Sequence, residues 1–140
     1  MKFLGSLDIS ASALSAQRLR MDIIAQNIAN SGTTRAENGG PYRRKIAVLG
    51  SMSVKGFKSV LDGALSGVRV SGIVEDQSPF RAVHDPSHPD ADENGDVMLP
   101  NVDTTQEMIE MMAATRAYES NITVLNSIKA MAQKALEIGR

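Results

Sequence analysis

Hydrophobic side chains recur every seven residues along the first part of the chain, between residues 6 and 31, where neither Gly nor Pro occurs. Such spacing, with further apolar residues three or four positions away, is typical of one face of an α-helix. We therefore predict one long amphipathic helix in this stretch. The heptad positions are Leu7, Leu14, Met21 and Ile28, flanked at helical spacing by Ala11, Ile24 and Ala25.

The ends and the composition of this first helix add two expectations. Ser6, Asp8 or Ser10 can each cap its start. Its end is predicted at residues 30–32, with Gly32 in the left-handed conformation that often closes a helix. Only four of the 26 residues are charged and ten are Ser or Ala, so we expect close neighbours on more than one side, either within the chain or from other subunits.

A second long helix is predicted near the end of the chain, because residues 102–138 also lack Gly and Pro. Its apolar positions alternate by three and four residues, as in a coiled-coil seam, and Thr115 and Lys129 are polar interruptions. The predicted frame is Met108, Met111, Thr115, Tyr118, Ile122, Leu125, Lys129, Ala132 and Leu136.

Two different signals mark the start of this second helix. Thr104, with Glu107 three residues later, has the pattern of a capping box, and Asp103 is an alternative N-cap. Gly139 predicts the end of the helix.

All five prolines lie between Pro41 and Pro100, and nine of the eleven glycines lie between Gly32 and Gly95, so these residues concentrate in the middle of the chain, residues 33–100. Its β-branched residues and partial alternation predict short strands rather than helices. The strands are expected within residues 42–49, 67–74, 80–83 and 97–99. Turn signals separate them at Gly39-Gly40-Pro41, Asp62-Gly63 and Asn94-Gly95.

Together these patterns predict a mainly α fold. Residues 1–32 and 101–140 are expected to pair as one discontinuous, coiled-coil-like helical domain, and residues 33–100 to form a small β-hairpin-rich or extended insert. Two helices alone leave apolar flanks uncovered, so either the insert or other subunits must cover them. These flanks include Met111, Met112, Ile128 and Met131.

Composition excludes several classes of protein. The 140 residues carry 15 Lys and Arg against 16 Asp and Glu, whereas a general nucleic-acid binder carries a strong basic excess. The absence of cysteine excludes disulfides, thiolate nucleophiles and zinc sites built on Cys. No stretch approaches the roughly 20 apolar residues of a membrane span, and the N-terminus lacks the apolar region of a secretory signal. We therefore expect a soluble chain without a cleaved targeting segment.

The sharpest candidate for a ligand site is the stretch 90–95, which matches the first half of a calcium loop. The bidentate Glu expected at position 12 of such a loop is Asn101 here, and Pro89 and Pro100 stand where flanking helices are needed. A structural acidic turn is therefore the preferred interpretation.

Two further clusters carry a weaker signal. His84 and His88 have the spacing of helical metal ligands, but Pro86 disfavours a helix and no third ligand is evident. The basic residues 43–45 could bind a phosphate or an acidic partner, and a solvated strand start is the preferred interpretation.

Catalytic chemistry has no support in the sequence. The serines of the first helix lack a His or acidic partner at fixed spacing, no glycine-rich phosphate loop is present, and the pair Glu75-Asp76 alone is weak evidence for acid–base work. We predict a protein that is not an enzyme and that binds no cofactor, metal or small-molecule substrate.

Several segments resemble a known family. They include residues 16–21, 24–30 and 39–44 in the first half, and residues 88–93, 99–102, 114–119 and 134–139 in the second. The chain resembles the rod and hook proteins of the bacterial flagellum, and among them the proximal rod subunits of the basal body. Its family-motif residues are Asn27, Asn30, His88, Pro89, Asp90, Pro100, Asn101 and Arg116. Asp96 departs from the pattern, because an aromatic residue usually follows Gly95 in these proteins.

The resemblance implies a structural, non-enzymatic subunit whose terminal helices line a helical tube that transmits motor torque. It implies export through the flagellar type III machinery, without a cleaved signal, to a periplasmic rod. The implied partners are copies of itself, other rod proteins, the MS ring and the base of the export gate, and no nucleic acid.

The residues expected to pack the helices together or to join subunits are Leu7, Leu14, Met21, Ile24, Ile28, Met108, Met111, Tyr118, Ile122, Leu125, Ala132 and Leu136. Two other hypotheses stay open: a cytoplasmic coiled-coil adaptor or export chaperone, and a calcium-modulated binding module.

Overall fold

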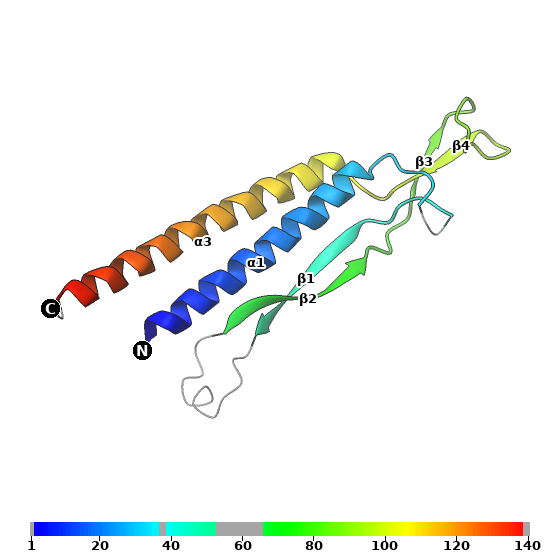
Figure 1. Ribbon diagram of the computed structural model, residues 1–140. Coiled ribbons are helices and arrows are strands. Elements are labelled where there is room, and N and C mark those ends of the chain that lie inside the picture. Colours follow the sequence, from blue (N-terminus) through cyan, green and yellow to red (C-terminus); the bar gives the residue numbers. More distant parts are fainter. Residues whose placement is uncertain (1, 37–38, 53–65, 139–140) are drawn as a thin grey trace.

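The computed structural model describes residues 2–36, 39–52 and 66–138, which form two long helices and four strands (Figure 1). The elements are α1 (Lys2–Ala29), β1 (Lys45–Met52), β2 (Gly67–Glu75), β3 (Arg81–His84), β4 (Asp96–Leu99) and α3 (Thr104–Ile138). The helices lie at the two ends of the chain and the strands between them, as predicted. The class "mainly α" holds only in part, because about half of the described residues are helical and about a fifth lie in strands.

The first helix, α1, lies between α3 and the β1–β2 hairpin (Figure 1). The helices are antiparallel, since Asn27 near the end of α1 bonds to Glu107 near the start of α3, whereas Met21 meets Thr115. Within the described residues the strands β1 and β2 pack on α1 and not on α3. The insert therefore does not cover the apolar flank of α3.

Small side chains let the β1–β2 hairpin approach α1 closely. The Ser12 hydroxyl donates to the carbonyl of Ile9 (2.7 Å) and accepts a hydrogen bond from the backbone N–H of Val68 (3.1 Å). A Cβ on Gly67 would lie 2.9 Å from the Ser12 Oγ, so a larger residue there would push the strand away. The predicted neighbours on several sides of α1 are met within the chain itself.

The heptad series of α1 lies along its two covered sides. Ile24 is buried, and so are Ala16 and Ile23 beside the predicted positions. Leu7, Leu14, Met21 and Ile28 are part-buried, whereas Ala11 and Ala25 are exposed.

The side of α3 that faces α1 follows the predicted frame only in part. The shared positions, all part-buried, are Met111, Thr115, Tyr118, Leu125 and Ala132. The positions between them are Glu107, Ala114, Asn121 and Ile128, each one residue before its predicted counterpart. As a result Met108 is 55% exposed and Ile122 is 37% exposed. The reason is that Glu107 has buried polar partners and that Ala114, only 1% exposed, allows the helices to approach.

The start of α1 differs from the prediction, whereas its end agrees with the predicted stop at residues 30–32 except for the conformation of Gly32. The helix begins at Lys2, so neither Ser6, Asp8 nor Ser10 caps its start. It ends at Ala29, and there the Asn30 amide donates to the carbonyl of Gln26 (2.8 Å) and accepts from the Thr33 hydroxyl (3.2 Å). Gly32 is not left-handed, because an Asn side chain rather than a glycine satisfies the free carbonyl.

At the start of α3, the alternative cap is the correct one. The Asp103 carboxylate accepts hydrogen bonds from the backbone N–H groups of Thr105 (2.8 Å) and Gln106 (3.3 Å). The predicted capping box of Thr104 and Glu107 is wrong, because the Glu107 side chain turns toward α1 instead. The predicted stop at Gly139 lies outside the described residues.

All four predicted strands are present, as two antiparallel hairpins. In the first, the register runs from Lys45↔Glu75 to Met52↔Gly67, with an irregularity between Val48 and Leu49. The predicted turn at residues 62–63 lies outside the described part of the chain. In the second hairpin His84 pairs with Asp96, and Gly95 supplies the positive φ (80°) of its turn.

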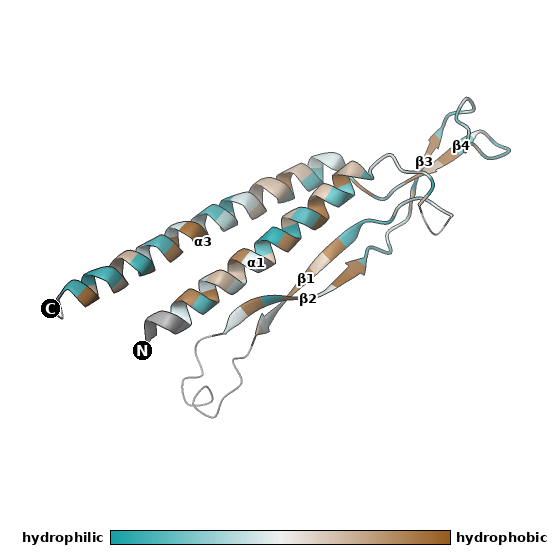
Figure 2. Ribbon diagram, in the orientation of Figure 1, coloured by the Kyte–Doolittle hydropathy of each residue, from teal (hydrophilic) through white to brown (hydrophobic). Residues whose placement is uncertain are grey.

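Hydrophobic residues are not confined to the interior of this fold (Figure 2). The strands β1 and β2 expose Ile46, Val48, Leu49, Met52, Ile73 and Val74. No helix in the described part of the chain is long and apolar enough to cross a membrane.

The packing of α1 predicts that two apolar residues of this helix contribute very differently to the free energy of unfolding. Ile24→Ala removes a buried side chain and is expected to lower the free energy of unfolding by about 2–5 kcal/mol. Leu19→Ala, at an exposed position, is the matched control and is expected to cost about 0.5 kcal/mol or less. Urea denaturation of the purified chain measures both, and equal losses would contradict this packing.

Candidate functional site: a polar junction and an exposed helix face

A buried polar junction joins α1, α3 and the start of β1. At its centre, the Asn27 amide donates to the carbonyl of Lys45 (2.8 Å) and to the Glu107 carboxylate (3.0 Å). Its side-chain oxygen accepts from the Lys45 N–H (3.0 Å) and from the Tyr42 hydroxyl (3.0 Å). A single amide therefore satisfies donors and acceptors from three segments of the chain.

Glu107 is the most deeply buried member of this junction, with 0% of its side chain exposed. Besides Asn27, its carboxylate accepts a charge-assisted hydrogen bond from the Arg44 Nε (2.5 Å). Burial of a carboxylate costs several kcal/mol unless it is paired and hydrogen-bonded, so these two partners are what allow an acidic residue between the helices.

Arg44 extends the junction to two further acidic residues. Its Nη2 lies 2.8 Å from Glu110 and its Nη1 lies 3.6 Å from Asp76. Burial by itself would lower the pKa of Arg44, but the hydrogen bond to Glu107 and the charges of Glu107 and Glu110 raise it instead. The interpretation of residues 43–45 as a solvated strand start is thus wrong for Arg44, whose acidic partners belong to its own chain.

Asn101, a family-motif residue, joins the junction from the loop before α3. Its side chain accepts from the backbone N–H of Arg44 (2.9 Å) and donates to the carbonyl of Asp76 (3.0 Å). Pro100 beside it is fully buried. Hydrogen bonds from Ser78, and secondarily the charge of Arg44, lower the pKa of Asp76.

The acidic stretch 90–95 forms the tip of the β3–β4 hairpin, as a structural turn. The Asp92 carboxylate accepts from the backbone N–H groups of Asn94 (2.9 Å) and Asp96 (3.0 Å). Asp90 accepts from the Thr34 hydroxyl (2.6 Å) and forms an ion pair with Arg35. These contacts use the carboxylates to tie the hairpin together and to attach it to the chain after α1.

The two histidines lie in the same hairpin and do not meet. His84 Nδ1 is 3.0 Å from the Asp96 carboxylate, across the strand pair. His88 Nδ1 accepts from the backbone N–H of Asp90 (3.1 Å). The described residues contain no group of three or more His, Asp or Glu side chains that could hold a metal ion.

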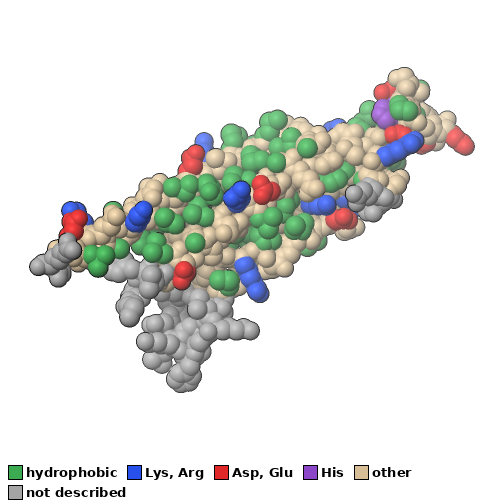
Figure 3. Space-filling view, viewed as in Figure 1, with side chains coloured by type: hydrophobic (Ala, Val, Ile, Leu, Met, Phe, Trp, Pro, Cys, Tyr) green, Lys and Arg blue, Asp and Glu red, His purple; other side chains and the backbone are tan. Residues whose placement is uncertain are grey.

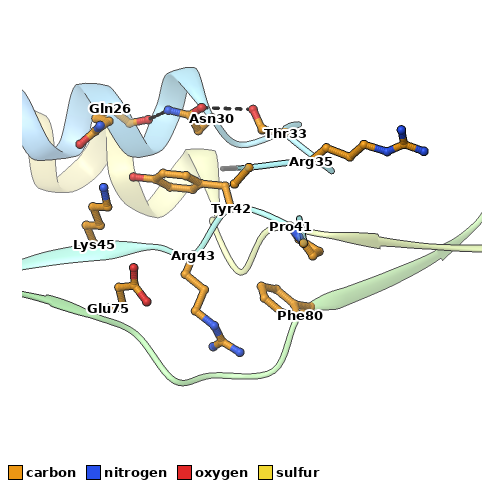
Figure 4. Close-up of a pocket in the computed structure, with 12 residues that line it drawn as sticks. Gln26, Asn30, Thr33, Arg35, Pro41, Tyr42, Arg43, Lys45, Glu75 and Phe80 are labelled. Atoms are coloured by element: carbon orange, nitrogen blue, oxygen red, sulfur yellow. Dashed lines mark hydrogen bonds between the residues drawn. The ribbon is translucent and has the colours of Figure 1, made fainter. Parts of the chain in front are cut away.

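An open groove of about 590 Å³ lies beside the junction (Figure 4). Tyr42 and Phe80 supply its aromatic surface, and the guanidinium of Arg43 lies over the Phe80 ring at 4.4 Å from its centre. The Lys45 ammonium lies 5.7 Å from the centre of the Tyr42 ring. Arg35 and Glu75 also line the groove, so three of its four charged side chains are basic.

The outward side of α3 carries large apolar side chains that no described part of the chain covers. Met108, Ile109 and Met112, here called the outer cluster, are each more than half exposed within a single turn and a half of helix. Val124 and Met131 are also exposed further along α3. Figure 3 shows hydrophobic side chains gathered on the surface over the helices. Patches of this kind mark protein–protein contact sites.

The family-motif residues lie in three parts of the structure. The junction and the helix ends contain Asn27, Asn30, Pro100 and Asn101; the hairpin contains His88, Pro89 and Asp90. Arg116 is exposed on α3, and the structure assigns it no hydrogen bond or ion pair among the described residues.

Two comparisons with known families cover both ends of the chain. Residues 7–36, mostly α1, match the family described as "Flagella basal body rod protein". Residues 95–138, which include β4 and α3, match the family described as "Flagellar basal body rod FlgEFG protein C-terminal".

Similar proteins span the whole chain. The flagellar basal-body rod protein FlgC of Bacillus subtilis (strain 168) is 49% identical over 146 residues, which cover 96% of this chain and 97% of that protein. The FlgC proteins of Borreliella burgdorferi and Salmonella typhimurium are 43% and 40% identical, with at least 98% of each chain covered. The chain belongs to the FlgC family of flagellar basal-body rod proteins.

Membership of the FlgC family confirms the resemblance seen in the sequence. The chain is a structural subunit of the flagellar basal-body rod and not an enzyme. The polar junction is accordingly a structural site, and no catalytic role is needed to explain its charges.

Sequence reasoning missed the roles of Tyr42, Glu107 and Glu110 in the junction, and it gave an acidic partner for residues 43–45 only as the less preferred interpretation. One usable signal was Asn27, a strongly polar residue next to the apolar stripe of a long helix. Such a residue needs hydrogen-bond partners from elsewhere in the chain when it is buried, but the sequence does not say which ones.

The geometry of the junction predicts that removing the Arg44 cation strongly lowers the free energy of unfolding. Arg44→Ala leaves the buried Glu107 carboxylate without its ion-pair partner and is expected to lower the free energy of unfolding by about 3–5 kcal/mol. The exposed Arg69→Ala is the matched control, with an expected change within about 0.5 kcal/mol. Urea denaturation would refute the role of the pair if both variants lost the same stability.

The Tyr42 hydroxyl predicts that the free energy of unfolding depends on pH in the alkaline range. Burial, and then the charges of Glu107 and Glu75, raise the pKa of Tyr42 above its usual value of 10.0. A raised pKa in the folded state means that this contribution to stability is complete below pH 10 and is lost as the pH rises through the folded-state pKa.

The test compares wild type with Tyr42→Phe, which lacks the hydrogen bond to Asn27 and is expected to be about 1 kcal/mol less stable at pH 7. Denaturation at several pH values should show this difference shrinking above pH 10. The same substitution at the part-buried Tyr118 is the control. A difference that stays constant up to pH 11.5, which is about 1.5 units above the ordinary tyrosine value, would contradict the assignment.

Proposed function

We propose that this subunit joins a helical proximal rod head to tail, with copies of itself and with other rod proteins, and that the outward side of α3 is one of its assembly surfaces. The observation that carries the proposal is the outer cluster, in which Met108 and Met112 are each 55% exposed. Contacts between unlike surfaces propagate into open helical assemblies, whereas a self-complementary patch closes into a dimer.

The predicted interface residues of α3 have two different roles, according to the side of the helix on which they lie. Met111, Tyr118, Leu125 and Ala132 face α1 and hold the helix pair together within one subunit. Met108, Ile122 and Leu136 are exposed and are available to neighbouring subunits. Residues 1–32 and 101–140 then act as one helical unit of the rod, and the strands β1 and β2 of the insert pack on the other side of α1.

Location and export follow from the same proposal. The subunit reaches the periplasmic part of the basal body through the flagellar type III machinery, and its partners include the MS ring and the base of the export gate. The small number of fully buried apolar side chains supports this route, because a chain that completes its burial on assembly is easily unfolded for export. Many parallel helix seams would let the rod transmit torque.

A cytoplasmic coiled-coil adaptor or export chaperone is the alternative, and the comparisons do not favour it. Fractionation distinguishes the two, because only the rod proposal requires the protein in purified basal bodies.

The outer cluster predicts a defect of assembly without a defect of folding. Met112→Asp is expected to abolish swimming, because an unpaired carboxylate in a packed interface costs about 3 kcal/mol or more, which is over about 100-fold in association. Its free energy of unfolding as a purified chain should change by no more than about 0.5 kcal/mol.

The conservative Met112→Leu keeps the apolar volume and should swim normally. Swimming is measured in soft agar, and the variant protein is sought in purified basal bodies. Normal assembly of the Met112→Asp variant would remove this surface from the rod contacts.

A further inference from the structure

We propose that the β3–β4 hairpin of a second copy of the chain docks in the groove beside Tyr42 and Lys45. The inference rests on the proposed function, since it names a further contact between subunits of the rod. It uses surfaces that are separate from the outer cluster of α3.

The groove offers an aromatic and basic surface. Tyr42 and Phe80 form its apolar part, and the basic side chains Arg43 and Lys45 line it together with the carboxylate of Glu75 (Figure 4). A third basic residue, Arg35, lies at the edge of the groove and is paired with Asp90 of its own chain. Lys45 forms no ion pair with any described residue of its own chain, and its ammonium lies 5.7 Å from the centre of the Tyr42 ring. A cation of this kind is available to an acidic partner.

The hairpin offers the complementary chemistry. It projects beyond the ends of the paired helices, at the end of the molecule opposite the chain termini (Figure 1). Residues 84–96 contain five acidic side chains and no Lys or Arg; the acidic residues are Asp85, Asp90, Asp92, Glu93 and Asp96. Glu93 is exposed, and none of the described residues bonds to its carboxylate.

The same hairpin exposes apolar residues that a partner would cover. All four residues of β3 are exposed, and Met98 of β4 is half exposed. An isolated two-stranded hairpin is marginally stable in water. Met98 and Val83 can therefore gain burial against Tyr42 and Phe80 while Glu93 approaches Lys45.

Within one copy, the hairpin meets the edge of its own groove, because Asp90 is held by Thr34 and by Arg35, a residue that lines that edge. Gln26 and Lys45 line the groove at the last turn of α1 and the start of β1. No described residue of the same copy bonds to the Glu93 carboxylate, so the tip beyond Asp90 is open to a second copy. The free hairpin of one copy and the free groove of the next are unlike surfaces, so the contact can repeat along a rod without closing.

The absence of cysteine from the chain allows a direct test by cross-linking. Gln26→Cys places a thiol in the groove, and Asn94→Cys places one at the hairpin tip, without altering Lys45 or Glu93. Motile cells that express the double variant are treated with a short bis-maleimide, and basal bodies are purified. We expect a ladder of cross-linked multimers on denaturing gels.

The control pair is Ser120→Cys, exposed on α3, with Asn94→Cys, and it should give no ladder. Equal ladders from both pairs, or a Gln26 product that contains only a different rod protein, would overturn docking between copies. The absence of a ladder in basal bodies that contain the variant would also overturn it, and would leave the rod function intact. Absence of the wild-type protein from basal bodies would instead overturn the proposed function.

Charge reversal tests the chemistry of the contact in the same cross-linking background. Lys45→Glu and Glu93→Lys should each lower the yield of multimers by about 2- to 5-fold, and the double reversal should restore it. Asp8→Lys, a reversal at an exposed position of α1, should leave the yield unchanged. Circular dichroism of each purified variant checks that the fold is retained. Failure of the double reversal to restore the yield would exclude pairing of these two charges.

Discussion

The buried carboxylate of Glu107 is the constraint on which the rest of the structure depends. It lies between the two helices with none of its side chain exposed, where it is tolerated only because Arg44 and Asn27 bind it. Arg44 belongs to the segment that enters β1, and Asn27 belongs to the last turn of α1. The ion pair therefore sets how far α3 slides along α1 and also where the first hairpin starts. Tyr42, from the same segment as Arg44, and Asn101, from the loop before α3, complete the network.

The position of Glu107 explains why the apolar residues of α3 divide into two sets. With an acidic residue at the inner position, Met108 turns outward, and the packed side continues through Ala114 and Ile128. The helix thus keeps one face for α1 and presents another to its surroundings. A helix with two apolar faces and one partner is suited to a subunit that completes its burial in an assembly. The chain belongs to the FlgC family of rod proteins, and a rod subunit can bury this exposed apolar surface against its neighbours.

The insert packs on α1 through the strands β1 and β2, on the side of α1 away from α3. Its first hairpin extends the covered part of α1, and its second projects from the end of the molecule, attached through Asp90. The junction residue Tyr42 also lines the basic, aromatic groove, whereas the acidic tip is held by Thr34 and Arg35. Conversely, the calcium-loop pattern at the tip is used for turn formation, since Asp92 binds backbone N–H groups that a metal ligand would have to release.

By itself, the sequence determined the two terminal helices, the four strands between them and the family, because hydrophobic periodicity, the positions of glycine and proline, and the rod-protein motifs are all local in the chain. It also determined the correct cap at Asp103, although not its choice over Thr104. Only the tertiary structure decided which residues of α3 face inward, because a heptad pattern cannot report that Glu107 would find Arg44, distant along the chain, as a partner. The same holds for the side of α1 on which the β1–β2 hairpin lies. Local sequence specifies the conformation of a segment, whereas the pairing of buried charges and the close approach of small residues depend on segments that only the fold brings together.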